Sequence, residues 1–279
     1  MKARPETLDS GLRALLRLAS AALLAMLIGP TVSAQAWADY ADGIDAYGRG
    51  DYAQAFAEWQ PLAEAGDRDS RYNLGALYFA GLGVVLDLER AAYWFGKSAE
   101  QGYALAQYNL GAMYAQGVGV LKNDDAALYL IRLAAGQGLA DAENTLGDFY
   151  RHGNIVAVDY EEALGWYERA AGKGWPDAQW SLGVMLSQGL GIAADEAEAA
   201  RWFRMAADQG QYLAQAELAL AYLDGRGIST DRQRAYFWLR LAIPGGFEDD
   251  EELAASLEAR LSPEELAEVE DWLQGGAPP

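Results

Sequence analysis

The chain carries few side chains that could perform nucleophilic or metal-assisted catalysis. Its 279 residues contain no cysteine and a single histidine, His152. A serine or threonine nucleophile needs a base beside it, and a zinc site needs several nitrogen or sulfur ligands. One histidine cannot complete either arrangement. We therefore expect a protein that is not an enzyme and that holds no cofactor and no metal ion.

The carboxylates leave one catalytic alternative open, because paired carboxylates can process a glycan. The chain has 41 Asp and Glu residues against 21 Lys and Arg, a formal net charge of −20, yet no pair stands out from the pattern. The acidic run 248–252 is better explained as the first turn of a helix, where negative charge is favourable. Nucleic acid and anionic membrane surfaces would repel this chain, whereas a basic partner would be attracted.

A period of 36 residues organises most of the sequence. A Leu-Gly pair recurs four times, and a second glycine recurs six times at the same spacing; the pairs begin at Leu74, Leu110, Leu146 and Leu182, and the second set is Gly66, Gly102, Gly138, Gly174, Gly210 and Gly246. A fixed period of this size predicts stacked helical repeats that present a long surface to another protein.

Each repeat is predicted to be a helical hairpin. In the unit 104–139, apolar residues at helical spacing pass through Leu110 and Met113, the stretch 117–119 interrupts them, and a second helix is expected over 123–135. Glycine inside a helix costs about 1 kcal/mol relative to alanine, so the Leu-Gly glycines predict close approach of a neighbouring helix. One position of the second helices is expected in the core, where it holds Trp94, Leu130, Trp166, Trp202 and Trp238.

These motifs resemble those of the Sel1-like repeat family, relatives of the tetratricopeptide repeats. The unit with Ala106, Leu110, Gly111, Tyr114, Gly117 and Gly119 matches the family pattern in full, whereas the fourth unit has Ile155 in place of the second loop glycine. The resemblance implies an all-α, right-handed α-solenoid of six helical hairpins with a C-terminal helical cap. It also implies that the chain binds a protein or peptide.

The expected organisation follows from the period. Residues 1–36 form a signal peptide, 248–275 form capping helices and 276–279 form a tail; the repeat units are about 37–67, 68–103, 104–139, 140–175, 176–211 and 212–247. Ser262, Pro263 and Glu265 complete a capping box that predicts a helix over 263–273.

The candidate binding residues lie on the first helices. Positions two before and two, five and six after the core leucine point away from the buried stripe at 100° per residue. The family resemblance implies that these positions line a concave face, and aromatic and charged residues there would anchor a partner, although some aromatics could instead pack between units. The candidates are Tyr72, Phe79, Tyr108, Asn144, Asp148, Arg151, Trp180 and Val184.

The N-terminal segment predicts export. Lys2, Arg4, Arg13 and Arg17 precede an apolar run over 18–28, and small residues follow, so cleavage is expected after Ala36 or after Ala34. An uncleaved anchor is the alternative, but the run is shorter than the roughly 20 residues that span a bilayer.

Together these features predict an exported, non-enzymatic scaffold that binds a protein or peptide in the cell envelope, in the periplasm or outside the cell. The alternatives are a protein that processes or binds cell-wall glycans through acidic residues, and a secreted factor that acts on host cells. The partner and the oligomeric state stay open.

Overall fold

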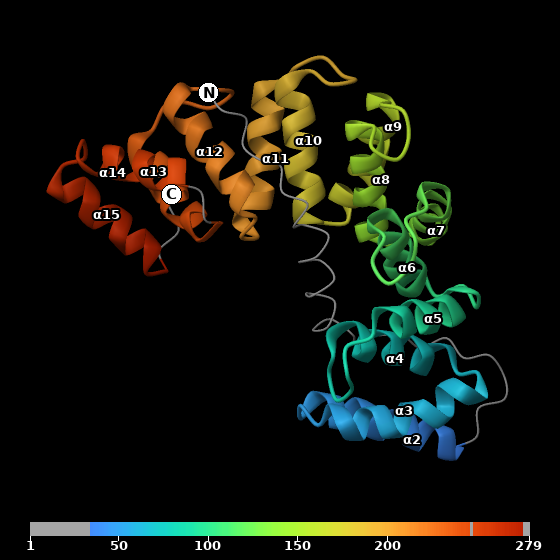
Figure 1. Cartoon of the computed structure of the whole chain (residues 1–279). Helices are drawn as coiled ribbons and strands as arrows, with labels where there is room; N and C mark the ends of the chain where they lie inside the picture. Colours follow the sequence, from blue (N-terminus) through green and yellow to red (C-terminus); the bar gives the residue numbers. More distant parts are fainter. Residues whose placement is uncertain (1–33, 246–247, 276–279) are drawn as a thin grey trace. The chain divides into compact units, whose positions relative to one another are not determined.

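The computed structural model describes residues 34–245 and 248–275, and within those ranges the chain is helical throughout, with no strand (Figure 1). The all-α repeat architecture predicted from the sequence is confirmed. The chain divides into two compact units, Met1–Ala142 and Glu143–Pro279, and the division falls in the first turn of α8 (Ala140–His152). Residues 1–33 of the predicted signal segment and the 276–279 tail lie outside the described residues, and α2 begins at Ala34, within the last three residues of that segment.

Paired helices build each unit. The first unit contains α2 (Ala34–Gly48), α3 (Tyr52–Ala65), α4 (Arg68–Ala80), α5 (Leu88–Ala99), α6 (Ala104–Gln116) and α7 (Asp124–Gly136). The second contains most of α8, then α9 (Tyr160–Gly172), α10 (Pro176–Gln188), α11 (Glu196–Asp208), α12 (Tyr212–Asp224), α13 (Arg232–Ala242), η2 (Ile243–Gly245), α14 (Glu248–Glu258) and α15 (Pro263–Leu273).

The two helices of a hairpin meet where the first helix has no side chain. A Cβ on Gly75 of α4 would lie 2.6 Å from the Phe95 ring of α5, and a Cβ on Gly183 of α10 would lie 2.6 Å from the Phe203 ring of α11. The same relation joins Gly43 to Trp59, Gly111 to Ile131 and Gly147 to Tyr167. The close approach predicted from the Leu-Gly pairs is therefore confirmed, and it is an approach between the two helices of one hairpin.

A capping residue fixes the start of every second helix. The side chains of Asp87 and Asn123 accept a hydrogen bond from the backbone N–H three residues ahead, and the N-caps Asp51, Asp159, Asp195 and Asp231 do the same. Such a cap satisfies a backbone donor that the helix leaves unpaired. Because the capping residue recurs every 36 residues, each hairpin starts its second helix at the same point.

Glycines in the loops let adjacent hairpins stack. Gly119 has φ +67°, and a Cβ there would lie 2.3 Å from the carbonyl oxygen of Leu88, at the start of the preceding second helix. Gly227 has φ +66° and meets the Glu196 carbonyl in the same way. Only glycine meets both demands, a left-handed backbone and direct contact with another backbone.

A buried polar ladder ties the two helices of a hairpin to each other and to the preceding hairpin. Gln137 Nε2 donates to Gln107 Oε1 at 2.7 Å, and one glutamine of this pair, Gln107, also donates to the Ala99 carbonyl at 3.3 Å. Two repeats later Gln209 Nε2 donates to Gln179 Oε1, again at 2.7 Å. Gln107 and Gln179 are 4% and 1% exposed, so these hydrogen bonds satisfy amides that would otherwise be costly to bury.

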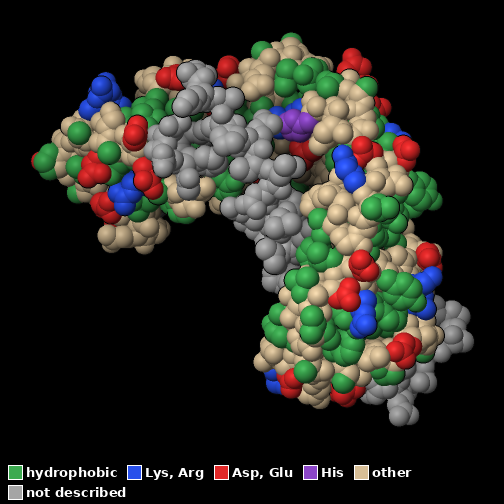
Figure 2. Space-filling view, viewed as in Figure 1, with side chains coloured by type: hydrophobic (Ala, Val, Ile, Leu, Met, Phe, Trp, Pro, Cys, Tyr) green, Lys and Arg blue, Asp and Glu red, His purple; other side chains and the backbone are tan. Residues whose placement is uncertain are grey.

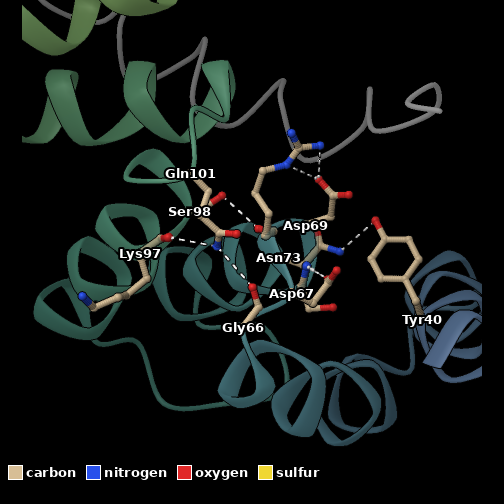
Figure 3. Close-up of polar contacts among 10 residues, drawn as sticks. Tyr40, Gly66, Asp67, Asp69, Asn73, Lys97, Ser98 and Gln101 are labelled. Carbon is tan, nitrogen blue, oxygen red and sulfur yellow. Dashed lines mark hydrogen bonds and ion pairs between the residues drawn. The ribbon is translucent and has the colours of Figure 1, made fainter. Parts of the chain in front are cut away.

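Figure 3 shows the corresponding junction in the first unit. Gln101 Nε2 donates to the Gly66 carbonyl at 3.2 Å, and Ser98 Oγ donates to the Arg68 carbonyl at 2.9 Å. On the first helices, Asn73 Nδ2 donates to Tyr40 Oη at 3.5 Å. The bonds from Gln101 to Gly66 and from Asn73 to Tyr40 tie the second repeat to the first, and the bond from Ser98 to Arg68 ties the two helices of the second repeat together.

The C-terminal helix has the predicted start. Ser262 accepts from the Glu265 N–H at 3.2 Å, and the Ser262 N–H donates to Glu265 Oε2 at 2.7 Å, with Pro263 at the first helical position. The predicted capping box and the helix Pro263–Leu273 are confirmed. Phe237 of α13 meets Trp272 of α15 edge to face, which holds this helix against the last hairpin.

Alanine substitutions at two helix glycines should shift stability in opposite directions. Gly183→Ala should lower the free energy of unfolding by about 1–3 kcal/mol, because its Cβ would overlap the Phe203 ring. Gly172→Ala is the matched control: nothing lies within 4 Å of its Cβ, so we expect a gain of up to about 1 kcal/mol from helix propensity. Urea denaturation of both variants measures this, and equal shifts would contradict the packing role of Gly183.

Candidate functional site

The fourth repeat, 140–175, carries polar or charged side chains at positions that are apolar or uncharged in the other repeats, apart from Arg71 at the position of Glu143. Asp148 stands where the neighbouring repeats have Ala76, Ala112, Val184 and Leu220, and Tyr167 stands where they have Phe95, Ile131, Phe203 and Leu239. Glu143 replaces the ladder glutamine, and Arg151 replaces Phe79, Ala115, Ser187 and Leu223. Departures from a repeat that otherwise satisfies its own packing rules are expected at functional sites.

Glu143 places a carboxylate inside the polar ladder. Its side chain is 0% exposed, and it accepts from Lys173 Nζ at 2.6 Å and from Arg169 Nε at 3.1 Å. Lys173 occupies the position of Gln101, Gln137 and Gln209, so both members of the ladder pair have changed together. A fully buried charge is tolerated only when it is paired and hydrogen-bonded, and these two cations provide that pairing.

Asp148 and Tyr167 form a second substituted pair across the hairpin. Tyr167 Oη donates to Asp148 Oδ1 at 2.6 Å, and Asn144 Nδ2 donates to Asp148 Oδ2 at 3.4 Å. Burial raises the pKa of Asp148 above its ordinary value, while the Tyr167 hydrogen bond and the positive charge of Arg151 oppose that rise. Burial also raises the pKa of Tyr167 well above 10. The pair is thus a buried acid held by a neutral phenol.

Arg151 connects this pair to the next hairpin. Its guanidinium carbon lies 5.9 Å from the centre of the Trp180 ring on α10, a cation–π distance. Arg151 Nη2 also lies 2.9 Å from His152 Nε2. We refer to Asn144, Asp148, Arg151, Tyr167 and Trp180 as the α8–α10 cluster. It combines an aromatic face, a fixed cation and buried hydrogen-bonding groups, which are features of a recognition surface.

Four predicted binding residues come together in this cluster: Asn144, Asp148, Arg151 and Trp180. All four are partly buried. Val184 follows Trp180 by one turn of α10, but its side chain is only 8% exposed and belongs to the core, contrary to its expected place on an open face. Phe79 is partly buried and packs near Phe95, with ring centres 6.5 Å apart.

The expectation that Tyr72 and Tyr108 are exposed is wrong. They are 6% and 4% exposed. Tyr72 packs edge to face on Tyr103 at 5.0 Å between ring centres and accepts from Asn109 Nδ2 at 3.5 Å, and burial raises the pKa of Tyr72 to about 12. This position therefore joins one first helix to the next, repeating the bond between Asn73 and Tyr40, and the packing alternative holds for it.

The sequence analysis did not identify Glu143, Tyr167, Arg169 or Lys173 as members of a network. A position-by-position comparison of the 36-residue units could have identified them. Glu143 and Lys173 both differ from the glutamines of the adjacent repeats, and Asp148 and Tyr167 both differ from the apolar residues of the other repeats. The second-helix position that was predicted to lie in the core is buried only at Trp238, which is 4% exposed; the other residues at this position are partly buried. The buried position is the next residue along each second helix, at Phe95, Ile131, Tyr167, Phe203 and Leu239.

The described part of the face drawn in Figure 2 shows no concentration of acidic charge. Figure 2 shows Asp and Glu side chains scattered over the visible face, with the single histidine at the surface. In the part of the chain that the structure describes, no three His, Asp or Glu side chains converge as metal ligands would. No described helix combines the length and the apolar character needed to cross a membrane.

Comparison with known proteins assigns the family. The model of the Sel1 repeat matches residues 68–103, 104–139, 140–175, 176–211 and 213–243, more than half of the chain. The chain belongs to the Sel1 repeat family. The third match, 140–175, covers the repeat with Ile155 in place of a loop glycine. No described residue other than glycine has positive φ, so the loop of this Sel1 repeat lacks the second left-handed residue that Gly119 and Gly191 supply.

Solved structures agree with this assignment. A Sel1 repeat protein from Oxalobacter formigenes is 32% identical, with a TM-score of 0.74, over 86% of this chain and 97% of that one. An immunity protein from Pseudomonas aeruginosa is 20% identical, with a TM-score of 0.51, over 82% of this chain and 85% of that one, which shows a shared fold. No curated protein matches the chain at a significant level.

The buried carboxylate of the fourth Sel1 repeat allows a direct test of the ladder. Lys173→Gln should lower the free energy of unfolding by about 1–3 kcal/mol, because it removes one of the two cations that pair Glu143. The double variant Glu143→Gln/Lys173→Gln should recover most of that loss, because it recreates the 2.7 Å amide pair of the adjacent repeats.

Urea denaturation of the two single variants and the double variant gives the coupling energy. If the double variant is as unstable as the sum of the single variants, residues 143 and 173 do not act as a ladder pair.

Proposed function

We propose that this Sel1 repeat protein is an exported, non-enzymatic scaffold that binds a protein or peptide partner in the cell envelope through the α8–α10 cluster. Sel1 repeats are in general scaffolds for protein–protein interaction, and the family supports a binding role. The observation that carries the assignment is the set of coordinated polar substitutions in the fourth repeat, which bring Asn144, Asp148, Arg151 and Trp180 together.

Folding alone gives no reason for these substitutions. The other repeats fill the positions of Asp148 and Tyr167 with alanine, valine, leucine, isoleucine or phenylalanine, and burying a carboxylate and a phenol in their place carries a desolvation cost. Arg151 on the Trp180 ring is an arginine–aromatic pair of the kind that dominates interface energetics. Binding of a partner to this pair would explain why the chain keeps residues that carry this desolvation cost.

Export rests on the N-terminal sequence. Four basic residues precede an apolar run and small residues follow it, the form of a secretory signal. Loss of residues 1–36 would remove four basic and two acidic residues, so the mature chain would be still more acidic than the precursor. Such a chain would attract a basic partner over distances of about a Debye length, roughly 8 Å at physiological salt.

Arg151→Ala should weaken partner binding by about tenfold or more, because it removes the cation above Trp180. Arg201→Ala is the matched control: Arg201 makes an exposed ion pair with Glu198 at 2.8 Å, remote in sequence from the cluster. The chain, expressed with its own N-terminus, is crosslinked in envelope extract, the partner is identified by mass spectrometry, and its affinity is then measured for both variants.

Two results would contradict the proposal. Equal binding by the Arg151→Ala and Arg201→Ala variants would remove the cluster from the interface. Turnover of peptidoglycan by the purified chain, lost on a single carboxylate substitution, would favour the glycan-processing alternative instead.

A further inference from the structure

Asn144 and Trp180 of the α8–α10 cluster each bury one polar atom without a hydrogen-bond partner. These atoms are Oδ1 of Asn144, an acceptor, and Nε1 of Trp180, a donor. A buried polar group left unpaired costs about 1–3 kcal/mol, so such groups are rare and call for an explanation. Here an unpaired acceptor and an unpaired donor occur in one cluster, at the same position of consecutive first helices.

Each of the two side chains makes one contact within the chain. Asn144 Nδ2 donates to Asp148 Oδ2, which leaves the amide oxygen as the group for another molecule. The Arg151 guanidinium carbon lies 5.9 Å from the centre of the Trp180 ring, and this contact does not use the indole N–H. Both residues are partly exposed, so a ligand can reach their side chains, and its binding would have to uncover the two buried atoms.

A peptide main chain provides the complementary pair. Each peptide residue carries one N–H donor and one C=O acceptor, and in an extended segment outside a sheet these groups are free, whereas a helix uses them internally. Recognition through the main chain does not depend on the ligand's side chains, so the neighbouring Arg151 and Trp180 ring face would supply selectivity.

We propose that the ligand of the α8–α10 cluster is an extended peptide segment whose main chain pairs with Asn144 and Trp180: one ligand N–H donates to Asn144 Oδ1, and one ligand C=O accepts from Trp180 Nε1. This inference rests on the proposed binding function and names the form of the ligand. A partner that binds through a helix or a folded surface would leave both atoms unpaired.

The test uses peptides of 12 residues selected from a displayed random library by the purified chain. Trp180→Phe keeps an aromatic ring beneath Arg151 but removes the N–H, and should weaken binding about five- to tenfold. Trp202→Phe, at a partly buried tryptophan of α11, is the control and should leave binding unchanged. Circular dichroism and urea denaturation establish that each variant is folded.

Backbone chemistry of the peptide supplies the decisive readout. A set of peptides is made, each with one N-methyl group at a different residue. At one residue the N-methyl group should lower the affinity for the wild-type chain about tenfold. The same N-methyl group should not lower the affinity for the Asn144→Leu variant, because both changes delete the same hydrogen bond. A uniform N-methyl profile, or wild-type affinity of Trp180→Phe, would overturn the inference while leaving the binding function standing. Failure to select any peptide would also overturn the inference, whereas the binding function is decided by the crosslinking experiment described above.

Discussion

Contact between a glycine of the first helix and a large side chain of the second helix sets the geometry of the first five hairpins. At Gly75, Gly147 and Gly183 the ring of the partner helix fills the space that a Cβ would occupy, at 2.5 or 2.6 Å from it. This contact fixes the distance and the rotation of the two helices together. The capping residue of each second helix then lies at a constant place, and the polar ladder can repeat.

The ladder explains how one repeat can vary without losing its place in the fold. In the typical repeat two glutamines pair at 2.7 Å, and in the fourth repeat Glu143 pairs with Lys173 and Arg169 by the same route. The exchange keeps the link between the two helices of the hairpin while introducing charge. At the positions of Asp148 and Tyr167 the other repeats have apolar residues, whereas here the two side chains form a hydrogen bond, and the Tyr167 ring still packs against Gly147. The fold therefore accepts polar chemistry in this repeat because each change is matched by its neighbour.

The sequence was sufficient to predict the repeat, the helical hairpins, the packing glycines and the C-terminal capping box, because all of these depend on local spacing and backbone conformation. Exposure on the first helices was harder to predict. Tyr72 and Tyr108 have the angular position of an open face, yet they are buried, and Tyr72 lies against Tyr103, outside its own helix. Angular position on one helix cannot reveal what the next element covers.

The candidate site was predicted only in part, because helix position alone does not reveal contacts with other helices. Asn144, Asp148, Arg151 and Trp180 were found from their helix positions, whereas Tyr167 and Glu143 lie on buried positions where periodicity alone predicts core. Only the comparison of a position across all repeats separates a polar residue that breaks the pattern from one that follows it. That comparison identifies the fourth repeat as the one specialised for binding.

The most direct measurement replaces the specialised residues with those of the third repeat and determines both partner affinity and stability. The variant carries Glu143→Gln, Asn144→Tyr, Asp148→Ala, Arg151→Ala, Tyr167→Ile and Lys173→Gln. We predict that it folds with an unfolding free energy equal to or above that of the wild-type chain and no longer binds the partner. Retained binding would show that the departures of the fourth repeat do not serve recognition, and failure to fold would show that they serve the fold; either result would contradict the account.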